Sequence, residues 1–541
     1  MCGIYVSISF PPSSFSSDHH EPQTPGLLAR LRNRGPDHVG HVRERLEFKG
    51  RSLSLSLTST VLALRGDGIT RQPLIDADTG SVLCWNGEAW SIASHPVQGN
   101  DAEAVLAACH AQSVVDALRA VEGPFAFVYL DRPAARLYYG RDRLGRRSLL
   151  MKPGDPWSLA SIADVPAAGW TEVEADGFYF LSLDAPSLTP VRIPWTLDSA
   201  LLSGLGLFNS SCPSFHVELT RQSPSVTQLR QKLEASLSRR VLKVPLPPHA
   251  QPPDARVAVL FSGGLDCTVL ARMASDMLPV DQAIDLINVA FENPRMAAQH
   301  PDVSQARLYE LCPDRITARK SFDELLQVCP QRTWRLVTVD VSASEASSHR
   351  SRVIELMYPH NTEMDISIAY ALYFAARGQG LGQEVGHAAE TKQYTTTARV
   401  LLSGLGADEL FGGYLRHATS FSRQGYRGLA EELRLDVERL GRRNLGRDDR
   451  VMAHWAREVR FPYLDEALAR WAIESPVWDK CDFANPGPDD GLEPGKRVLR
   501  LLAEELGMIK VAVEKKRAIQ FGARTAKMSS AKIKGTSLIA A

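Results

Sequence analysis

The sequence predicts an α/β protein of two domains, because the spacing of its apolar residues changes along the chain. With 541 residues, the chain is longer than a single hydrophobic core usually supports. The first part carries short runs of alternating apolar and polar residues, which are typical of strands with one buried face. In the second part, apolar runs alternate with stretches of helical spacing. That alternation favours a parallel sheet with helices on both faces.

The first part predicts a layered sheet domain with a few covering helices. Its clearest helical pattern runs from Asp101 to Ala111. Residues 194–224, which are rich in Ser, Pro, Leu and Gly, are interpreted as the crossing between domains, and a helix is expected at 226–241. The strands expected in the first domain are 52–64, 82–85, 125–130, 137–139 and 178–183, and those expected in the second are 256–261, 285–291, 335–341 and 399–403.

Residues 257–268 combine a strand, a glycine turn and the start of a helix. Gly263 and Gly264 let the backbone turn tightly and expose its N–H groups. Those groups and the positive end of the helix dipole face one point, where an anion binds well. Asp266 adds a carboxylate that can hold Mg²⁺ beside bound phosphates. The stretch has no Gly-Lys-Ser/Thr string, which excludes a P-loop, and the alternative is a plain glycine turn.

A second strand runs into Ser403-Gly404 and then into the acidic pair Asp408-Glu409. In a parallel sheet, both loops lie at the carboxyl ends of strands, where ligands bind. Asp408 then offers a second carboxylate for Mg²⁺ with pyrophosphate. The alternative is a turn followed by the solvated acidic start of a helix.

Cys2 carries a free α-amine if Met1 is removed, and removal is plausible because cysteine is small. Its thiol then has a base of its own, since an α-amino group has a pKa of about 7.7–8.0 and can take the thiol proton near neutral pH. The alternative is an ordinary residue next to the start of the chain.

The composition gives no electrostatic case for nucleic acid or an anionic membrane as a partner, because 62 Lys and Arg balance 62 Asp and Glu. The eight cysteines are scattered without a Cys-x-x-Cys pair or zinc spacing, which indicates a reduced, intracellular protein. No apolar run approaches the ~20 residues of a membrane span, and the start lacks the layout of a signal peptide. We therefore expect a soluble protein of the cytosol or nucleus, with a cytoplasmic location as the default.

Five strings of the first part, in this order, resemble the class II glutamine amidotransferase domain: Cys2-Gly3-Ile4, Arg34-Gly35-Pro36-Asp37, Leu62-Ala63-Leu64-Arg65 with Gln72-Pro73-Leu74, Asn86-Gly87-Glu88, and Asn100-Asp101-Ala102-Glu103. Arg141-Asp142-Arg143-Leu144-Gly145 then resembles the closing motif of that domain in asparagine synthetases. The resemblance implies an Ntn-type αββα domain over residues 2–195 that releases ammonia from glutamine.

The resemblance also implies roles for single residues. Cys2 would attack the side-chain amide of glutamine, and the Asn86 side chain with the Gly87 N–H would form the oxyanion hole. Arg65, a planar fork of donors, would hold the α-carboxylate. Asp101, with the segment Gly87-Glu88, would hold the α-amine.

Residues 257–268 resemble the Ser-Gly-Gly-x-Asp-Ser loop of ATP pyrophosphatases, with Cys267 in place of Ser, so the contact to phosphate is expected to be looser. Residues 401–414 resemble the Leu-Ser-Gly-Glu-Gly-Ser/Ala-Asp-Glu-Leu-Phe-Gly-Gly-Tyr signature of asparagine synthetases. The resemblance implies an ATP-pyrophosphatase domain, similar to adenine nucleotide α-hydrolases, over residues 225–530. Residues 196–224 are then the linker and 531–541 the tail.

The same resemblance implies ATP and Mg²⁺ as cofactors, with the metal held by Asp266 and Asp408. Lys516, or its neighbour in Lys515-Lys516-Arg517, would meet the adenylate and pyrophosphate. The ATP-binding positions that the resemblance implies are Leu260, Ser262, Gly263, Gly264, Asp266, Cys267, Val289, Ser403 and Gly404.

Two single residues depart from mainstream asparagine synthetases. Leu405 stands where the signature has Glu, and Leu cannot accept a proton or orient an amine. Tyr370 falls where an Arg would face phosphate, although Ile366, Ala369 and Tyr373 share its spacing and also fit a buried helix face.

Residues 381–397 have no period and look like an inserted loop near the expected site, either a lid or a mere insertion. Residues 434–460 interleave Arg with Asp and Glu, which predicts a solvated, salt-bridged helix face rather than a nucleic-acid patch. Together with the tail string 516–522, the departures resemble the eukaryotic asparagine synthetase domain-containing branch.

The leading hypothesis is an ATP-dependent amide ligase that makes asparagine from aspartate, with glutamine as nitrogen donor, through a Cys2 glutaminase and an acyl-adenylate. One alternative is the same fold amidating a different carboxylate, which Leu405 motivates. The other is a catalytically weak paralogue that binds or regulates. The expected partners are small-molecule substrates, and a homodimer is compatible with the resemblance.

Overall fold

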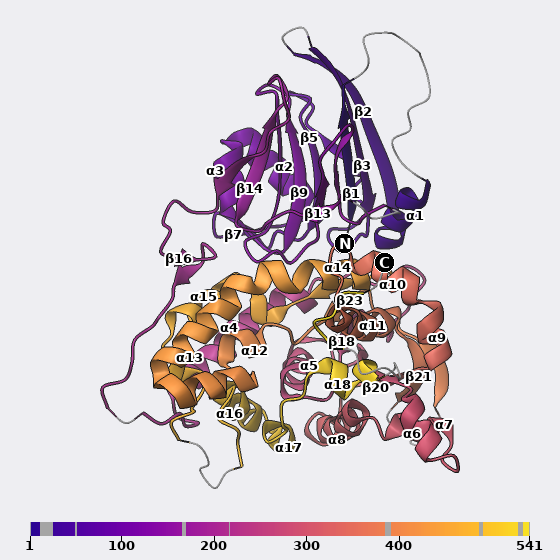
Figure 1. The fold of residues 1–541 in the computed structure, drawn as a ribbon, viewed down its shortest axis with the longest axis vertical. Helices are drawn as coiled ribbons and strands as arrows, with labels where there is room; N and C mark the ends of the chain where they lie inside the picture. The colour runs from indigo at the N-terminus through magenta and orange to yellow at the C-terminus, as the bar shows by residue number, and fades with distance from the viewer. Residues whose placement is uncertain are drawn as a thin grey trace. The chain divides into compact units, whose positions relative to one another are not determined.

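The computed structural model describes residues 2–10, 25–48, 51–164, 169–215, 217–384, 391–485, 491–527 and 534–539. The chain forms two compact units, drawn together in Figure 1. Unit 1 comprises Met1–Ser199 with two later segments, Ile354–His360 and Leu440–Arg457. Unit 2 comprises Ala200–Val353, Asn361–Arg439 and Glu458–Ala541.

Unit 1 contains two six-stranded antiparallel sheets. The first has the strand order β13-β11-β12-β1-β3-β2, and the second has the order β15-β14-β10-β9-β5-β4. The strands of unit 1, including those of a small third sheet (β7-β6-β8), are β1 (Gly3–Ser9), β2 (His38–Phe48), β3 (Arg51–Val61), β4 (Leu74–Ile75), β5 (Val82–Gly87), β6 (Ser91–Ile92), β7 (His95–Pro96), β8 (Val121–Glu122), β9 (Phe125–Asp131), β10 (Arg136–Arg141), β11 (Leu150–Lys152), β12 (Trp157–Ala160), β13 (Thr171–Glu172), β14 (Gly177–Ser182) and β15 (Val191–Pro194).

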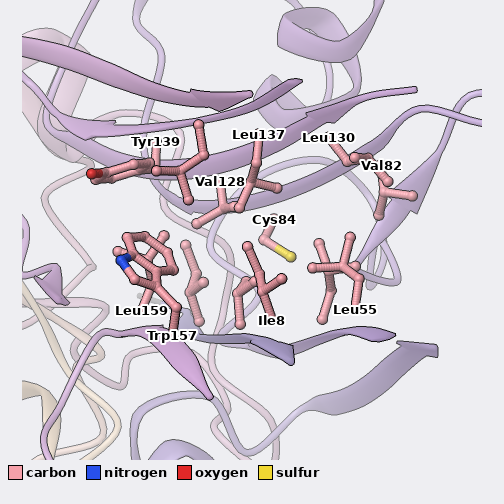
Figure 2. Close-up of a cluster of buried hydrophobic side chains, with 14 of the residues drawn as sticks. Ile8, Leu55, Val82, Cys84, Val128, Leu130, Leu137, Tyr139, Trp157 and Leu159 are labelled. Carbon is pink, nitrogen blue, oxygen red and sulfur yellow. The ribbon is translucent and has the colours of Figure 1, made fainter. Parts of the chain in front are cut away.

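An apolar core lies between the two large sheets, and Figure 2 shows its side chains meeting from both layers. Strand β9 illustrates how alternation builds it. Ala126, Val128 and Leu130 belong to this core, and the residues between them point into a second core on the other face of the same sheet. Ile8 and Leu55 reach the first core from the opposite sheet.

Helices cover the outer faces of these sheets. Helices α2 (Asp101–Ala111) and α3 (Val114–Ala120) pack into the second core, and α1 (Pro25–Arg34) packs on β1 and β3. Asn100 fixes the start of α2, because its side chain accepts hydrogen bonds from the backbone N–H groups of Ala102 and Glu103. The order helix, sheet, sheet, helix confirms the αββα architecture that the amidotransferase resemblance implies.

Unit 2 is built on a seven-stranded sheet with the order β22-β21-β20-β19-β18-β23-β24. Five neighbouring strands, β20, β19, β18, β23 and β24, run parallel. At one edge of the sheet, β21 pairs antiparallel with β20, and β22 pairs antiparallel with β21. The strands are β18 (Val257–Leu260), β19 (Ile284–Phe291), β20 (Trp334–Val341), β21 (Gln379–Glu384), β22 (Lys392–Thr395), β23 (Val400–Leu402) and β24 (Glu458–Arg460), with a separate pair, β16 (Leu201–Leu202) and β17 (Gly206–Leu207).

Strand β18 is the point where the chain order of this sheet reverses. The chain moves from β18 through β19 to β20 on one side, and then returns to place β23 on the other side of β18. In open α/β sheets, ligands bind outside the carboxyl ends of the strands at such a reversal. The loops after β18 and β23 therefore lie at the expected place for a ligand, and they carry the two Ser-Gly strings.

Helices α5, α8 and α11 contact the central strands of this sheet. The helices of the second half of the chain are α4 (Pro224–Val241), α5 (Leu265–Met277), α6 (Pro294–Gln299), α7 (Gln305–Glu310), α8 (Pro313–Val328), α9 (Ala343–Ser348), α10 (Arg350–Met357), α11 (Glu363–Arg377), α12 (Ala407–Phe411), α13 (Leu415–Arg443), α14 (Leu445–Ala453), α15 (Glu466–Glu474), α16 (Arg497–Glu505), α17 (Ile509–Ala512) and α18 (Ile519–Gly522), of which α14 belongs to unit 1. Among the helices in the described ranges, none has the length and apolarity needed to cross a membrane.

The strands expected at the centre of both domains are present, and the expected helices at 101–111 and 226–241 are present too. The buried helix face proposed around Tyr370 is also confirmed. Ile366, Ala369, Tyr370 and Tyr373 are all buried on α11, and the ring of Tyr370 stacks on Phe374. Tyr370 is thus part of the helix packing.

The expectation of an inserted loop near the ATP loop at 381–397 is wrong for the residues that the structure describes. They form the hairpin of β21 and β22, in which Leu381 pairs with Thr338 and Glu384 pairs with Arg335. The hairpin therefore leads toward the amino ends of the parallel strands, away from the loop after β18. Tyr394 anchors it there by donating a hydrogen bond of 2.9 Å to Asp285. Residues 385–390 of this stretch lie outside the described residues.

The expectation of a solvated helix face over 434–460 holds for only part of that stretch. Arg434 and Glu438 on α13 form an exposed pair, as expected. Every residue of α14 is buried, including Asp449 and Arg450. The charges of α14 are compensated by other buried charges rather than by water, so local spacing alone gave the wrong environment.

Candidate functional site

Cys2 lies directly before β1 and is 7% exposed. Its backbone N–H donates a 2.9 Å hydrogen bond to Oδ1 of Asn86. Nε2 of Gln72 lies 3.9 Å from Sγ of Cys2, and Nε of Arg34 donates to the Cys2 carbonyl at 3.3 Å. Three polar side chains therefore surround the segment that carries the thiol.

Asn86 presents an unused donor beside Cys2. The residue is fully buried in β5, and its Nδ2 has no hydrogen-bond partner among the residues that the structure describes. A buried donor without a partner is costly, and it is useful where a ligand can accept its hydrogen bond. The next residue, Gly87, has φ +151°, and a Cβ there would lie 2.1 Å from the Pro124 carbonyl oxygen. The backbone conformation and the close packing at position 87 therefore require glycine.

Charged side chains lie around the end of β5. Nη1 of Arg65 lies 3.1 Å from Oε2 of Glu88. Oδ2 of Asp101 accepts hydrogen bonds from the Ala89 N–H at 2.9 Å and from the Trp85 indole N–H at 3.0 Å. Burial raises the pKa of Asp101, while the Ala89 N–H and the Arg65 guanidinium act in the opposite direction. The structure thus gathers all five positions expected to bind glutamine around the end of β5.

Gln72 and Arg34 lie in two of the amidotransferase-like strings, but the sequence assigns no role to either residue. The backbone N–H of Trp85 donates a 2.8 Å hydrogen bond to Oε1 of Gln72. This bond fixes the Gln72 side chain so that its amide NH₂ group faces Cys2. Arg34 is fixed by Oδ2 of Asp449, at 2.8 Å from its Nη2. The signal for Gln72 was its place in the string after Arg65, but the string alone does not tell which residue faces the thiol.

The loop after β18 is shaped by its first glycine. Gly263 has φ +79°, and a Cβ there would lie 2.4 Å from the backbone of Ala318 on α8. Gly264 caps α5, and the Ser262 hydroxyl accepts its N–H at 3.3 Å. The turn is therefore held against α8, with the amino end of α5 directly behind it.

Cys267 occupies the first turn of α5. Its thiol donates to the Gly264 carbonyl at 3.3 Å and lies 3.5 Å from the Ser262 hydroxyl. Burial raises the pKa of the Cys267 thiol, which stays neutral. The Cys267 thiol therefore makes its hydrogen bonds within the loop.

The loop after β23 meets the loop after β18. A Cβ on Gly404 would lie 2.9 Å from the Cβ of Asp266, so the two loops are in van der Waals contact. The Ser403 hydroxyl accepts the N–H of Leu405 at 3.3 Å. Leu260 pairs with Ile287, two residues before Val289, in the neighbouring strand. All nine positions expected to bind ATP therefore lie at or near one edge of the sheet.

Two carboxylates and two lysines meet at this edge. Nζ of Lys496 lies 2.8 and 2.9 Å from the two carboxylate oxygens of Asp266 and 2.9 Å from Oδ1 of Asp408. Lys516 pairs with Oδ2 of Asp408. Asp408 and Glu409 are buried, so the alternative of a solvated acidic helix start is wrong. We call Asp266, Asp408, Lys496 and Lys516 the acid–lysine cluster.

The cluster is strongly coupled electrostatically. Burial opposes the charge of Asp408, but Lys496 and Lys516 outweigh it and hold the pKa of this carboxyl well below its usual range. Burial also opposes the charge of Lys496, but Asp266 and Asp408 together raise the pKa of its ammonium. Burial raises the pKa of Asp266, which Lys496 lowers in part. The ion pairs are therefore maintained by one another.

Family comparisons agree with both halves of this arrangement. Residues 1–168 match the glutamine amidotransferase domain model, and residues 387–428 and 421–534 match the asparagine synthase model. Asparagine synthetase domain-containing protein 1 of Bos taurus is 31% identical, covering 98% of this chain and 96% of the relative. The Mus musculus protein of the same name is 32% identical, covering 99% and 98%, and an asparagine synthetase domain-containing protein of Saccharomyces cerevisiae is 33% identical, covering 88% and 84%.

The chain belongs to the asparagine synthetase domain-containing protein family. This confirms the family that the ordered motifs indicated, down to the branch. It also agrees with the observed α/β fold, in which an αββα amidotransferase domain precedes a parallel-sheet domain.

Lys496 is a further functional candidate that the sequence did not reveal. The sequence around it assigns no role to it. It adopts left-handed backbone angles (φ +55°) directly before α16, and its side chain is 3% exposed. A lysine in front of a helix is usually a surface charge, so only the fold reveals that it lies between two acidic residues.

The two carboxylates of the acid–lysine cluster could serve as ligands for a divalent cation. Both acidic side chains offer oxygen ligands, which Mg²⁺ prefers. A Cβ on Gly413 would lie 2.0 Å from Oδ1 of Asp408, and Gly404 leaves similar room for Asp266. Glycine at both positions keeps the backbone close to the carboxylates without blocking them.

Proposed function

We propose that the protein is an ATP-dependent amide ligase that takes nitrogen from glutamine and transfers it to a carboxylate activated as an acyl-adenylate. The observation that carries the proposal is the acid–lysine cluster at the chain reversal of a parallel sheet, next to a glycine turn and a helix amino end. The buried Cys2–Asn86 arrangement in unit 1 supports the glutamine half. We place the two activities in residues 2–195 and 225–530, with 196–224 as linker.

In the first half-reaction, the Cys2 thiolate would attack the side-chain amide carbon of glutamine. The negative charge on the amide oxygen would be accepted by Asn86 Nδ2 and the Gly87 N–H. Arg65 would hold the α-carboxylate, and Asp101 with Glu88 would hold the α-amine. If Met1 is removed, the α-amine of Cys2 takes the thiol proton and passes it to the leaving ammonia. Water then cleaves the thioester to release glutamate.

In the second half-reaction, a substrate carboxylate would attack the α-phosphorus of ATP, and pyrophosphate would leave. The loop N–H groups of residues 262–264 and the amino end of α5 would orient the phosphates. Lys496 and Lys516 would compensate the charge that develops on pyrophosphate. Mg²⁺, held by Asp266 and Asp408, would neutralise phosphate charge when bound. Ammonia would then attack the acyl carbon, and AMP would leave.

Aspartate is the first candidate acceptor, and a different carboxylate is the second. The observation that favours the second is Leu405, which is half-buried beside Gly404. A leucine there cannot orient ammonia or an amine, so the acceptor contacts of this site differ from those of the asparagine synthetase signature. Restoring Leu405→Glu is expected to raise aspartate turnover if Leu405 limits it.

Product analysis of the purified protein tests the proposal. Glutamine, aspartate and Mg²⁺-ATP would be supplied together, and glutamate, asparagine, AMP and pyrophosphate would be quantified. We expect all four in equal amounts if aspartate is the acceptor. If aspartate gives glutamate but no AMP, and another carboxylate then gives AMP, that other carboxylate is the acceptor. No AMP with any carboxylate would contradict the proposal.

A further inference from the structure

The acid–lysine cluster contains a chain cation at the position that a metal ion would need. A cation that ligates Asp266 and Asp408 at once must lie within about 2.1 Å of an oxygen of each. The Lys496 ammonium lies within 2.9 Å of oxygens on both. We call this place between the two carboxylates the bridging position. An ammonium and a metal ion cannot occupy it together, because their atoms would overlap and their positive charges would repel each other.

The charges of the cluster are already balanced. Two carboxylates contribute two negative charges, and Lys496 and Lys516 contribute two positive charges, so the sum is zero. A divalent cation arriving alone would add two positive charges to a largely buried, neutral group of side chains. Like charges repel strongly where water does not screen them, so such binding is unfavourable.

Lys496 also has little freedom to yield without a new anionic partner. Its side chain is 3% exposed, so its ammonium cannot simply turn into water. Leaving a buried ammonium unpaired costs several kcal/mol. A bound polyphosphate offers the missing partner, since it brings its own negative oxygens to the same edge of the sheet.

We propose that the Lys496 ammonium and a divalent cation are alternative occupants of the bridging position, so that the cation enters only with a polyphosphate that takes over the ammonium. The proposal rests on the proposed ATP site. In the free protein, Lys496 holds the two loops together. With nucleotide bound, Lys496 pairs with phosphate, and the two carboxylates become ligands.

The test uses Mn²⁺ as the probe, because the electron paramagnetic resonance signal of free Mn²⁺ is lost on binding. With the wild-type protein alone, we expect no saturable site at millimolar Mn²⁺. Adding α,β-methylene ATP, whose bond to the leaving pyrophosphate cannot be cleaved, should create one, seen as a loss of signal beyond that which the same nucleotide causes without protein. A saturable site in the wild-type protein without nucleotide, removed by Asp408→Asn, would overturn the proposal.

Lys496→Met should open the bridging position and bind Mn²⁺ without nucleotide at least about tenfold more tightly than the wild type. Lys516→Met is the matched control, because it removes the same charge from Asp408 without touching Asp266. It should gain much less. An equal gain in both variants would show a general charge effect and would overturn the proposal. Lys496→Gln replaces Lys496→Met if circular dichroism shows the latter to be unfolded.

These measurements involve no turnover, so they separate this inference from the proposed function. Mn²⁺ binding to Lys496→Met without nucleotide, together with no nucleotide-dependent site in the wild type, would support the bridging position and contradict ATP binding. The reverse pattern, with nucleotide-dependent binding and no gain in Lys496→Met, would support ATP binding and overturn the exchange.

Discussion

At the scale of single residues, the turn after β18 depends on one glycine more than on the other. Gly263 has a positive φ and would place a Cβ against α8, whereas the nearest atom to a Cβ on Gly264 is the Ser262 hydroxyl at 3.4 Å. Gly263→Ala should therefore lower the free energy of unfolding by at least about 1–3 kcal/mol. Gly264→Ala should change it by less than about 1 kcal/mol. Urea unfolding followed by circular dichroism measures both, and equal effects would contradict this account of the turn.

Asp314 gives a pH-dependent prediction at the same scale. It is 6% exposed at the start of α8, and burial raises its pKa to about 7 from an ordinary value of 3.8, while Arg517 and Lys516 oppose the rise. Between these two values the folded protein holds a proton that the unfolded chain has released, so this group lowers stability as pH rises from about 4 to 7.

Asp314→Asn should remove this contribution. The variant should lose less of its urea midpoint between pH 5 and pH 8 than the wild type does, because an amide does not ionise. Other groups titrate in both proteins, so the difference between the two profiles isolates Asp314. Parallel profiles would show that Asp314 keeps its ordinary pKa in the folded protein.

At the scale of elements, buried ion pairs join α14 to the rest of unit 1. Arg34 and Asp449 are both fully buried and lie 2.8 Å apart, and Arg34 also holds the Cys2 carbonyl. Removing one partner leaves the other charge buried without compensation, so Asp449→Ala should cost about 3–5 kcal/mol of stability.

The exposed pair Arg442–Glu174 is the matched control, since its side chains are 65% and 49% exposed. Glu174→Ala should cost less than about 1 kcal/mol, because water screens this pair. Urea unfolding of both variants gives the comparison. A cost of Asp449→Ala as small as that of Glu174→Ala would contradict the attachment of α14 by buried charge.

The elements also show what the sequence could and could not predict. Strands such as β9 were predictable from their short apolar runs, and α2 was predictable from its helical spacing. The hairpin of β21 and β22 was missed because its Gly, Gln and Thr residues lack a buried face of their own. The burial of α14 was missed because the compensating charges come from distant parts of the chain.

The candidate sites followed the same division. Motif order predicted Cys2, Asn86 and Asp266 because each occupies a fixed place beside a strand end. Lys496 and Gln72 could not be selected, because their significance depends on which atoms the fold brings near them. Spacing along the chain predicts the loops at strand ends, and only three-dimensional packing shows which cations and amides complete them.

At the scale of the whole molecule, the proposed reaction is divided between two groups of residues in one chain. The first holds a thiol next to a buried amide N–H that has no partner among the described residues, and the second holds two acidic residues and two lysines beside the glycine turn after β18. If the first only supplies ammonia, the second must still work when ammonia is supplied from solution. This separability distinguishes a two-site ligase from a protein that merely hydrolyses glutamine or binds ATP.

The most direct measurement is AMP formation by Cys2→Ala with Mg²⁺-ATP and aspartate, using either ammonium or glutamine as nitrogen source. We expect the variant to form AMP with ammonium at the wild-type rate and none with glutamine, while Cys212→Ala, which removes an exposed thiol, uses both. Glutamine-dependent AMP formation by Cys2→Ala, or loss of both activities in a folded variant, would contradict the two-site account.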